Sequence, residues 1–213
     1  MIFGQEVFDP VEVGTVAAAH RDALGDSVLT LLGQNFLEDF YRCALRSELE
    51  WLYFNRVSGR IAAVCLASLE PGSLLRRAVS SQFPGFVVAA SSAFRHSASF
   101  RSIAWGTLKD SVARRPAPGA PEIVLVYALR DFRRRGIAKQ IVTTAEQHLG
   151  ELGHDKCFVR TLDDPTNGAL AFYSDLGYSR IGTAKTGGRE FITLSKTLIA
   201  KGGQGKNAEQ SSQ

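Results

Sequence analysis

The stretch from Glu122 to Leu152 constrains the fold more than any other part of the chain. It opens with an apolar run, Ile123 to Leu129, that is rich in β-branched residues and too short to cross a membrane, which predicts a buried strand. Apolar residues at helical spacing then predict an amphipathic helix ending at Gly150 or Gly153: Ala138, Ile141, Val142, Ala145, Leu149 and Leu152. A strand, a turn and a helix therefore follow one another directly.

The turn between this strand and this helix carries three consecutive arginines, Arg133 to Arg135. Cations in the first turn of a helix are disfavoured by about 0.3–1 kcal/mol each, because the helix dipole is positive there. The backbone N–H groups of that turn also lack partners within the helix. A bound anion resolves both conflicts, and the small residues Gly136 and Ala138 let backbone amides approach a phosphate. The turn predicts a pyrophosphate site; a solvated basic turn is the alternative.

The pattern Arg133-x-x-Gly136-x-Ala138 after an apolar strand resembles the acyl-CoA-binding motif of the GCN5-related N-acetyltransferase (GNAT) family. A second block, Ala169 to Tyr178, resembles the later helix of that family and the strand after it. The resemblance covers about residues 120–197 and extends more weakly back to about residue 50. It implies an α/β fold of the α+β type, with a mixed, mostly antiparallel sheet flanked by helices.

The resemblance also implies where the cofactor binds. The pyrophosphate of acetyl-CoA would lie on backbone amides of the turn, which comprises Arg133, Arg134, Arg135, Gly136, Ile137, Ala138 and Lys139. The pantetheine arm would bind the backbone of Val126, Tyr127 and Ala128, where the fourth strand of the family splays from the fifth. The family often has an asparagine seven residues before its tyrosine; here Thr166 holds that spacing and Asn167 follows it, so Asn167 is a candidate contact or a helix cap.

Catalytic roles follow from the same resemblance. Tyr173 stands where relatives place a tyrosine near the cofactor sulfur, and a phenol is protonated at neutral pH, so we expect it to act as the general acid. The alternative is an aromatic ring packed beside Phe172. Glu122 is the candidate general base, against the alternative of an exposed glutamate at a strand end. His20 and His96 titrate in a useful range, but nothing in the sequence places either at the acceptor. No metal site is predicted.

The remaining chain predicts a single domain over residues 1–200 and a disordered tail over 201–213. Residues 71–119 exceed what the family core needs and predict two or three helices inserted between the third and fourth strands. The other expected elements are a strand at 2–8, helices at 11–23 and 27–45 with Gly33 inside or breaking the second, a hairpin at 51–69, a strand at 156–162, a helix at 169–176 and strands at 178–182 and 190–196.

Composition narrows the class of protein and its location. Hydrophobic content of 45% and charged content of 22% are typical of a globular protein, and the N-terminus does not resemble a signal peptide. The three cysteines are odd in number and widely spaced, which favours core residues in a reducing, cytoplasmic setting. Residues 1–50 hold nine acids and three strong bases, so the net charge of +4 arises from a basic later part that suits a polyanionic cofactor. The bases are not interleaved with aromatics, which argues against nucleic acid.

Together these features predict an acetyl-CoA-dependent N-acetyltransferase that moves an acetyl group directly to a primary amine. A small-molecule amine or an amino sugar is the first expectation for the acceptor. A protein N-terminus or lysine is an alternative acceptor, and a non-catalytic acyl-CoA-binding regulatory domain is an alternative function. A nucleotide site of the Rossmann or P-loop type is excluded, because neither glycine pattern is present. A homodimer remains open.

Overall fold

The structure is a computed structural model, and it describes residues 10–25, 27–81, 83–96, 119–164, 168–186 and 189–199. Four expectations lie outside these ranges: the strand at 2–8, the part of the insertion at 97–118, the role of Asn167 and the tail at 201–213. Within the described ranges, no helix has both the length and the apolar character needed to cross a membrane.

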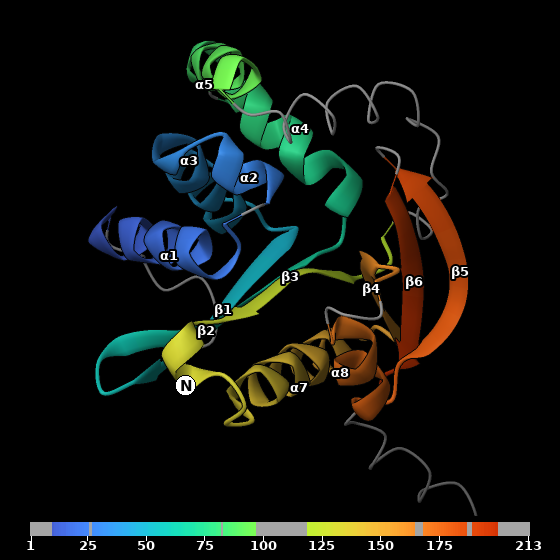
Figure 1. Cartoon of the computed structure of the whole chain (residues 1–213). Helices are drawn as coiled ribbons and strands as arrows, with labels where there is room; N and C mark the ends of the chain where they lie inside the picture. The colour runs from blue at the N-terminus through green and yellow to red at the C-terminus, as the bar shows by residue number, and fades with distance from the viewer. Residues whose placement is uncertain are drawn as a thin grey trace, which may run out of the picture.

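The described residues form one six-stranded sheet in the order β1-β2-β3-β4-β6-β5 (Figure 1). Neighbouring strands run antiparallel except for β3 and β4, which run parallel. The prediction of a mixed, mostly antiparallel sheet is confirmed. The strands are β1 (Glu50–Val57), β2 (Arg60–Ser68), β3 (Glu122–Ala128), β4 (Lys156–Leu162), β5 (Ser179–Thr186) and β6 (Arg189–Thr197).

Helices cover both faces of the sheet (Figure 1). One hydrophobic cluster joins β1, β2 and β3 to α1, α3, α4 and α5, and a second joins the sheet to α7 and α8 on the opposite face. The helices are α1 (Pro10–Ala23), α2 (Val28–Leu31), α3 (Gln34–Leu45), α4 (Pro71–Ser81), α5 (Phe83–His96), α7 (Ile137–Glu151) and α8 (Ala169–Asp175), with a 3-10 turn η1 (Arg130–Phe132).

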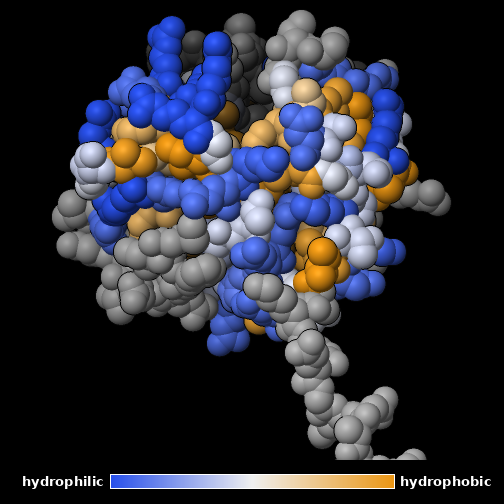
Figure 2. All heavy atoms as spheres, turned by 90° about the horizontal axis from the view of Figure 1, so that it is seen from below, coloured by the Kyte–Doolittle hydropathy of each residue, from blue (hydrophilic) through white to orange (hydrophobic). Residues whose placement is uncertain are grey.

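The outer surface on the α7 side is polar. Figure 2 shows this side of the molecule, on which hydrophilic side chains dominate and hydrophobic patches are separate. Of the predicted apolar stripe of α7, Ile141, Val142, Ala145 and Leu149 are buried, whereas Leu152 is exposed and lies just past the helix. The helix ends at Glu151, and the chain turns away at Gly153 (φ +90°), whose N–H donates to the carbonyl of Gly150.

Gly33 resolves a question that the sequence left open. Its φ of +91° ends the short helix α2 and places it as the N-cap of α3, so the predicted helix at 27–45 is two helices. The predicted insertion contains α4 and α5, which lie between β2 and β3. These are the third and fourth strands of the prediction, in which the expected strand at 2–8 is counted first. Arg77 of α4 bonds the buried carboxylate of Glu50, so α4 is tied to the edge of the sheet.

Candidate functional site

The parallel strands β3 and β4 separate soon after they begin. They pair only at Glu122 with Phe158 and at Ile123 with Val159, whereas β3 stays paired with β2 as far as Ala128. From Val124 onward, this edge of β3 has no strand partner, and we call the unpaired stretch between the two strands the β3–β4 opening. The register of β3 against β2 also skips Val124, a β-bulge at the point where the opening starts.

The backbone groups that face this opening can be identified from one hydrogen bond. The N–H of Leu129 donates to the carbonyl of Ala62 on β2, 3.0 Å away. Backbone groups of successive residues in a strand point to opposite edges, so Tyr127 also directs its backbone at β2, whereas Val126 and Ala128 direct theirs at the opening. Of the three residues predicted to bind pantetheine, Val126 and Ala128 have the required orientation.

The turn from Arg133 to Lys139, which we call the cradle, lies just beyond the end of β3. Arg134 (φ +58°) and Gly136 (φ +74°) both adopt the left-handed conformation. Gly136 is the N-cap of α7 and offers no side chain to the first helical turn, whose bonding starts with the N–H of Gln140 to its carbonyl. The preceding amides, from Ile137 to Lys139, thus have no helical acceptor. Such a turn at a positive helix end can hold an anion, and the predicted pyrophosphate site remains a prediction.

Gly136 is favoured by its conformation and leaves free space where a side chain would lie. A Cβ placed on Gly136 would meet no atom within 4 Å, so packing does not demand glycine there. A φ of +74° does favour glycine, because the left-handed conformation costs other residues about 1–2 kcal/mol. The space that a side chain would occupy is open to a ligand.

The arginines of the cradle have different roles. Arg133 donates from Nε to the carbonyl of Ala128 (3.1 Å) and from Nη2 to the carbonyl of Ala23 at the end of α1 (3.3 Å). It therefore fixes the cradle to both β3 and α1. Arg135 lies over the ring of Phe132, 5.7 Å from its centroid, and its side chain is exposed, as are those of Arg134 and Lys139. These exposed cations flank the open amides in the sequence.

Tyr173 lies on α8, on the α7 side of the opening. Its ring is 7% exposed and packs in the same cluster as the side chains of Val126 and Ala128, with Phe172 at a ring distance of 5.0 Å. Burial raises the pKa of Tyr173 well above its ordinary value, with smaller contributions from Cys65 and Cys157. Tyr173 is thus a proton-bearing group close to the opening, and its role as general acid remains a prediction.

Glu122 is buried, with 2% of its surface exposed, so the alternative of an exposed strand end is wrong. Its Oε1 accepts a hydrogen bond from Nε of Arg160 on β4, 2.9 Å away. The pair lies where β3 and β4 are still joined, about 7 Å along the strand from the bulge at Val124. The structure therefore holds Glu122 in an ion pair near the closed end of the opening, and its role as general base remains a prediction.

Burial makes Cys65 and Cys157 poorly suited to act as nucleophiles. Burial raises the pKa of the Cys157 thiol to about 12 and that of Cys65 well above its usual value, so both stay protonated at neutral pH. Both lie in the core as predicted, while Cys43 is half-buried.

Sequence reasoning missed a group of polar side chains on the other face of the sheet. His20 is fully buried, its Nδ1 lies 2.7 Å from the hydroxyl of Tyr41, and that hydroxyl lies 3.4 Å from the hydroxyl of Tyr127. Burial lowers the pKa of His20 to about 4. These residues are 21 and 86 positions apart, so no local pattern in the sequence could join them.

Comparisons with known proteins identify the family. The model of the acetyltransferase (GNAT) family matches residues 27–178, which is well over half of the chain. No curated protein sequence matches the chain.

Solved structures share the fold at low sequence identity. The ribosomal-protein-S18-alanine N-acetyltransferase of Escherichia coli aligns over 95% of this chain and 97% of its own, with 9% identity and a TM-score of 0.55. An N-acetyltransferase of Staphylococcus aureus Mu50 aligns over 92% of this chain and 100% of its own (14% identity, TM-score 0.59). An aminoglycoside 6′-N-acetyltransferase in complex with coenzyme A aligns over 95% and 100% (11% identity, TM-score 0.59). With the family match, this chain belongs to the GNAT family of acetyl-CoA-dependent N-acetyltransferases.

Proposed function

We propose that the chain transfers an acetyl group directly from bound acetyl-CoA to a primary amine of a small molecule or an amino sugar. One observation carries the proposal: the β3–β4 opening starts at the bulge of Val124 and leads along β3 to the uncapped amides of the cradle. The distance from Val124 to Ala128 is about 13 Å along an extended strand, which provides a track for the arm between thioester and pyrophosphate.

The cradle and β3 would hold acetyl-CoA by backbone groups. The amides of Ile137, Ala138 and Lys139 would bind the pyrophosphate, with exposed arginines adding positive charge. Val126 and Ala128 would bind the pantetheine arm, and an amide at this edge would polarise the thioester carbonyl. The assignment of Asn167 as a further contact rests on its sequence position alone.

The chemical step is attack of the amine nitrogen on the thioester carbonyl, with release of the coenzyme thiolate. Tyr173 would donate a hydrogen bond to the leaving sulfur. Since its raised pKa lies above the ~8.5 of an ordinary thiol, complete proton transfer to sulfur is unfavourable, and stabilisation by hydrogen bonding is its main contribution. The buried, protonated thiols of Cys65 and Cys157 give no support to a covalent acyl-enzyme.

Deprotonation of the amine is assigned to Glu122. The hydrogen bond from Arg160 fixes the position of this carboxylate at the closed end of the opening, where it would act as an acceptor. Because Glu122 is buried, the proton would reach it through an intervening polar group or a water rather than by direct contact.

The acceptor class is supported by the helices on the α1–α5 face. α4 and α5 pack against α3, and α4 is tied to the sheet through Arg77 and Glu50. A face covered in this way favours a compact acceptor over a peptide. The solved neighbours include one enzyme for an alanine of a ribosomal protein and one for aminoglycosides, so the fold is compatible with both.

The test is calorimetric titration with acetyl-CoA, with NAD as the control ligand. Gly136→Glu places a carboxylate in the open space of the cradle, and we expect no measurable binding. Gly153→Glu is the matched control: Gly153 also has a positive φ with no atom near a Cβ, but lies at the opposite end of α7, so its affinity should remain close to wild type. Binding by Gly136→Glu at wild-type affinity would refute the site.

A screen of amino sugars, polyamines and peptides then identifies the acceptor by release of free thiol. Turnover with peptides alone would replace the small-amine proposal by protein acetylation. Tight acetyl-CoA binding without turnover on any amine would favour the regulatory domain.

A further inference from the structure

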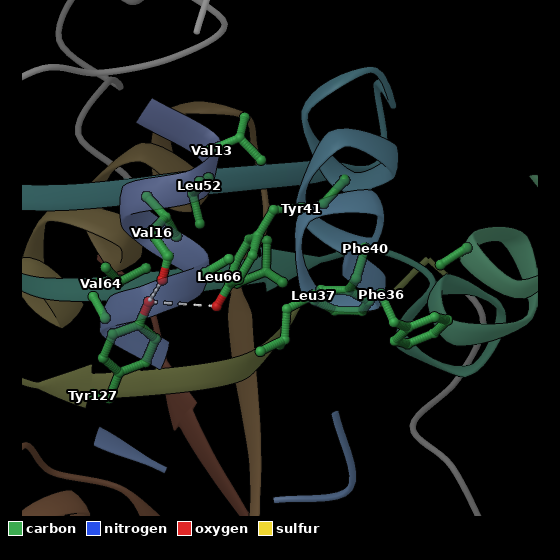
Figure 3. Close-up of a cluster of buried hydrophobic side chains, with 14 of the residues drawn as sticks. Val13, Val16, Phe36, Leu37, Phe40, Tyr41, Leu52, Val64, Leu66 and Tyr127 are labelled. Atoms are coloured by element: carbon green, nitrogen blue, oxygen red, sulfur yellow. Dashed lines mark hydrogen bonds between the residues drawn. The ribbon is translucent and has the colours of Figure 1, made fainter. Parts of the chain in front are cut away.

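A continuous set of hydrogen bonds links β3 to the end of α1. We call it the Tyr127 network; its side chains are those of Tyr127, Tyr41, His20, Ser27 and Thr30. Figure 3 shows the hydroxyl of Tyr127, from β3, between the carbonyl of Val16 on α1 (3.0 Å) and the hydroxyl of Tyr41 on α3 (3.4 Å). The network continues through His20 to Ser27 and Thr30 and ends at the carbonyl of Leu24.

The direction of every bond in the network follows from its two carbonyl ends. A carbonyl only accepts, so Thr30 gives its one hydroxyl proton to Leu24, 2.8 Å away, and the Ser27 hydroxyl must donate to Thr30. Ser27 then has no proton left for His20, so Nε2 of the imidazole donates to Ser27.

The same reasoning orients the other end of the network. With Nε2 protonated, Nδ1 of the neutral ring accepts from the hydroxyl of Tyr41 at 2.7 Å. The proton of Tyr127 is shared between the carbonyl of Val16 and the oxygen of Tyr41, as in a three-centre bond. All donors point one way, from β3 toward the end of α1, and such chains strengthen one another.

A second tie joins the same two elements. Arg133 of the cradle bonds both the carbonyl of Ala128, at the end of β3, and that of Ala23, at the end of α1. Tyr127 itself lies between Val126 and Ala128, the residues whose backbone faces the β3–β4 opening. α1 is therefore held both to the strand and to the cradle at which acetyl-CoA is proposed to bind.

We propose that the Tyr127 network is a positioning device that couples the cofactor site to α1 and α2. Tyr127, Tyr41 and His20 touch neither reactant; they transmit the position of β3 to the helices of the opposite face. Acetyl-CoA bound along β3 and on the cradle then orders α1 and α2, and these helices are pre-arranged for the second substrate. The inference rests on the proposed cofactor site.

The experiment measures amide hydrogen exchange of α1 and α2 in the full chain, with and without saturating acetyl-CoA, in wild type and in three single-hydroxyl deletions. Tyr127→Phe removes the link to β3, and Tyr41→Phe interrupts the network one step further on. Tyr53→Phe is the matched control, because the buried hydroxyl of Tyr53 bonds His148 of α7 at 2.7 Å and lies outside the network. Calorimetry verifies that each variant binds acetyl-CoA.

In wild type, acetyl-CoA should slow exchange in α1 and α2 by about fivefold or more, and Tyr53→Phe should preserve this effect. In Tyr127→Phe and Tyr41→Phe the cofactor should still bind, but the slowing should fall below about twofold. A purely structural role would lower stability without removing the ligand-dependent difference. Two outcomes would overturn the inference alone: a full slowing of exchange in both network variants, or a wild type that binds acetyl-CoA without any slowing. If wild type does not bind acetyl-CoA, the proposed function and the inference both fail. If Tyr127→Phe does not fold, Tyr41→Phe decides the question.

Discussion

Replacing His20 by glutamine tests how a buried imidazole links stability to pH. The ring is fully buried, and burial lowers its pKa from 6.5 to about 4. Between about pH 6.5 and about pH 4, the imidazole of His20 therefore binds a proton in the unfolded chain but stays neutral in the folded chain. Stability from the neutral ring is complete above about pH 6.5 and is lost as the pH falls toward 4.

The size of the effect follows from the two pKa values. At about pH 5 the unfolded imidazole is almost fully protonated and the folded one almost neutral, so wild type loses about 2 kcal/mol relative to about pH 7.5. The side chains that face the ring, Tyr41, Tyr127 and Ser27, stay uncharged over this range, because burial raises the pKa of both phenols. Glutamine keeps a donor and an acceptor but does not titrate.

Guanidinium unfolding of wild type and His20→Gln at several pH values measures this contribution. The difference in unfolding free energy between the two proteins should shrink by about 2 kcal/mol between about pH 7.5 and about pH 5, while other titrating groups cancel. In parallel, the NMR signal of the His20 ring should stay constant down to about pH 5. A stability difference that does not change with pH, or a ring that titrates near its ordinary pKa, would refute the reasoning.

Two further predictions concern catalysis. Tyr173→Phe should lower kcat by about tenfold to a hundredfold while acetyl-CoA affinity stays unchanged, because the lost hydrogen bond is made to the leaving sulfur. Release of free thiol measures kcat, and calorimetry measures the affinity. An unchanged kcat would exclude a role for Tyr173 at the leaving sulfur. Glu122→Gln should remove the acidic limb of the kcat/KM profile against pH and destabilise the fold by about 1–3 kcal/mol, because Arg160 loses its charged partner. An acidic limb that persists would place the base elsewhere.

Local patterns predicted the centre of the fold well. The strand β3, the helix α7 and the strand β4 begin and end within about one residue of where hydrophobic periodicity put them. Gly136 was expected to lie close to a ligand, and the structure adds that its positive φ is the local reason for glycine. The sequence allowed Gly33 either to lie inside a helix or to break it, and only its positive φ in the fold decides between these alternatives.

Contacts between segments far apart in the chain could not be predicted from the sequence. Glu122 was weighed as an exposed strand end, but it is buried, and Arg160, 38 positions later, lies beside it on the parallel strand. Tyr127 was assigned to the cofactor through its backbone. The pairing with β2 turns that backbone away from the opening, and its hydroxyl instead joins a network with α1 and α3.

The sequence by itself determined the strand–turn–helix unit and the family, and it predicts an anion site at the cradle. These depend on periodicity, glycine conformation and helix ends, all of which act over a few residues. Only the tertiary structure decided where β3 and β4 separate, which backbone groups face the opening, and how His20, Tyr41 and Tyr127 share their protons. Those properties arise from strand register and burial, and both are set by the packing of segments far apart in the chain.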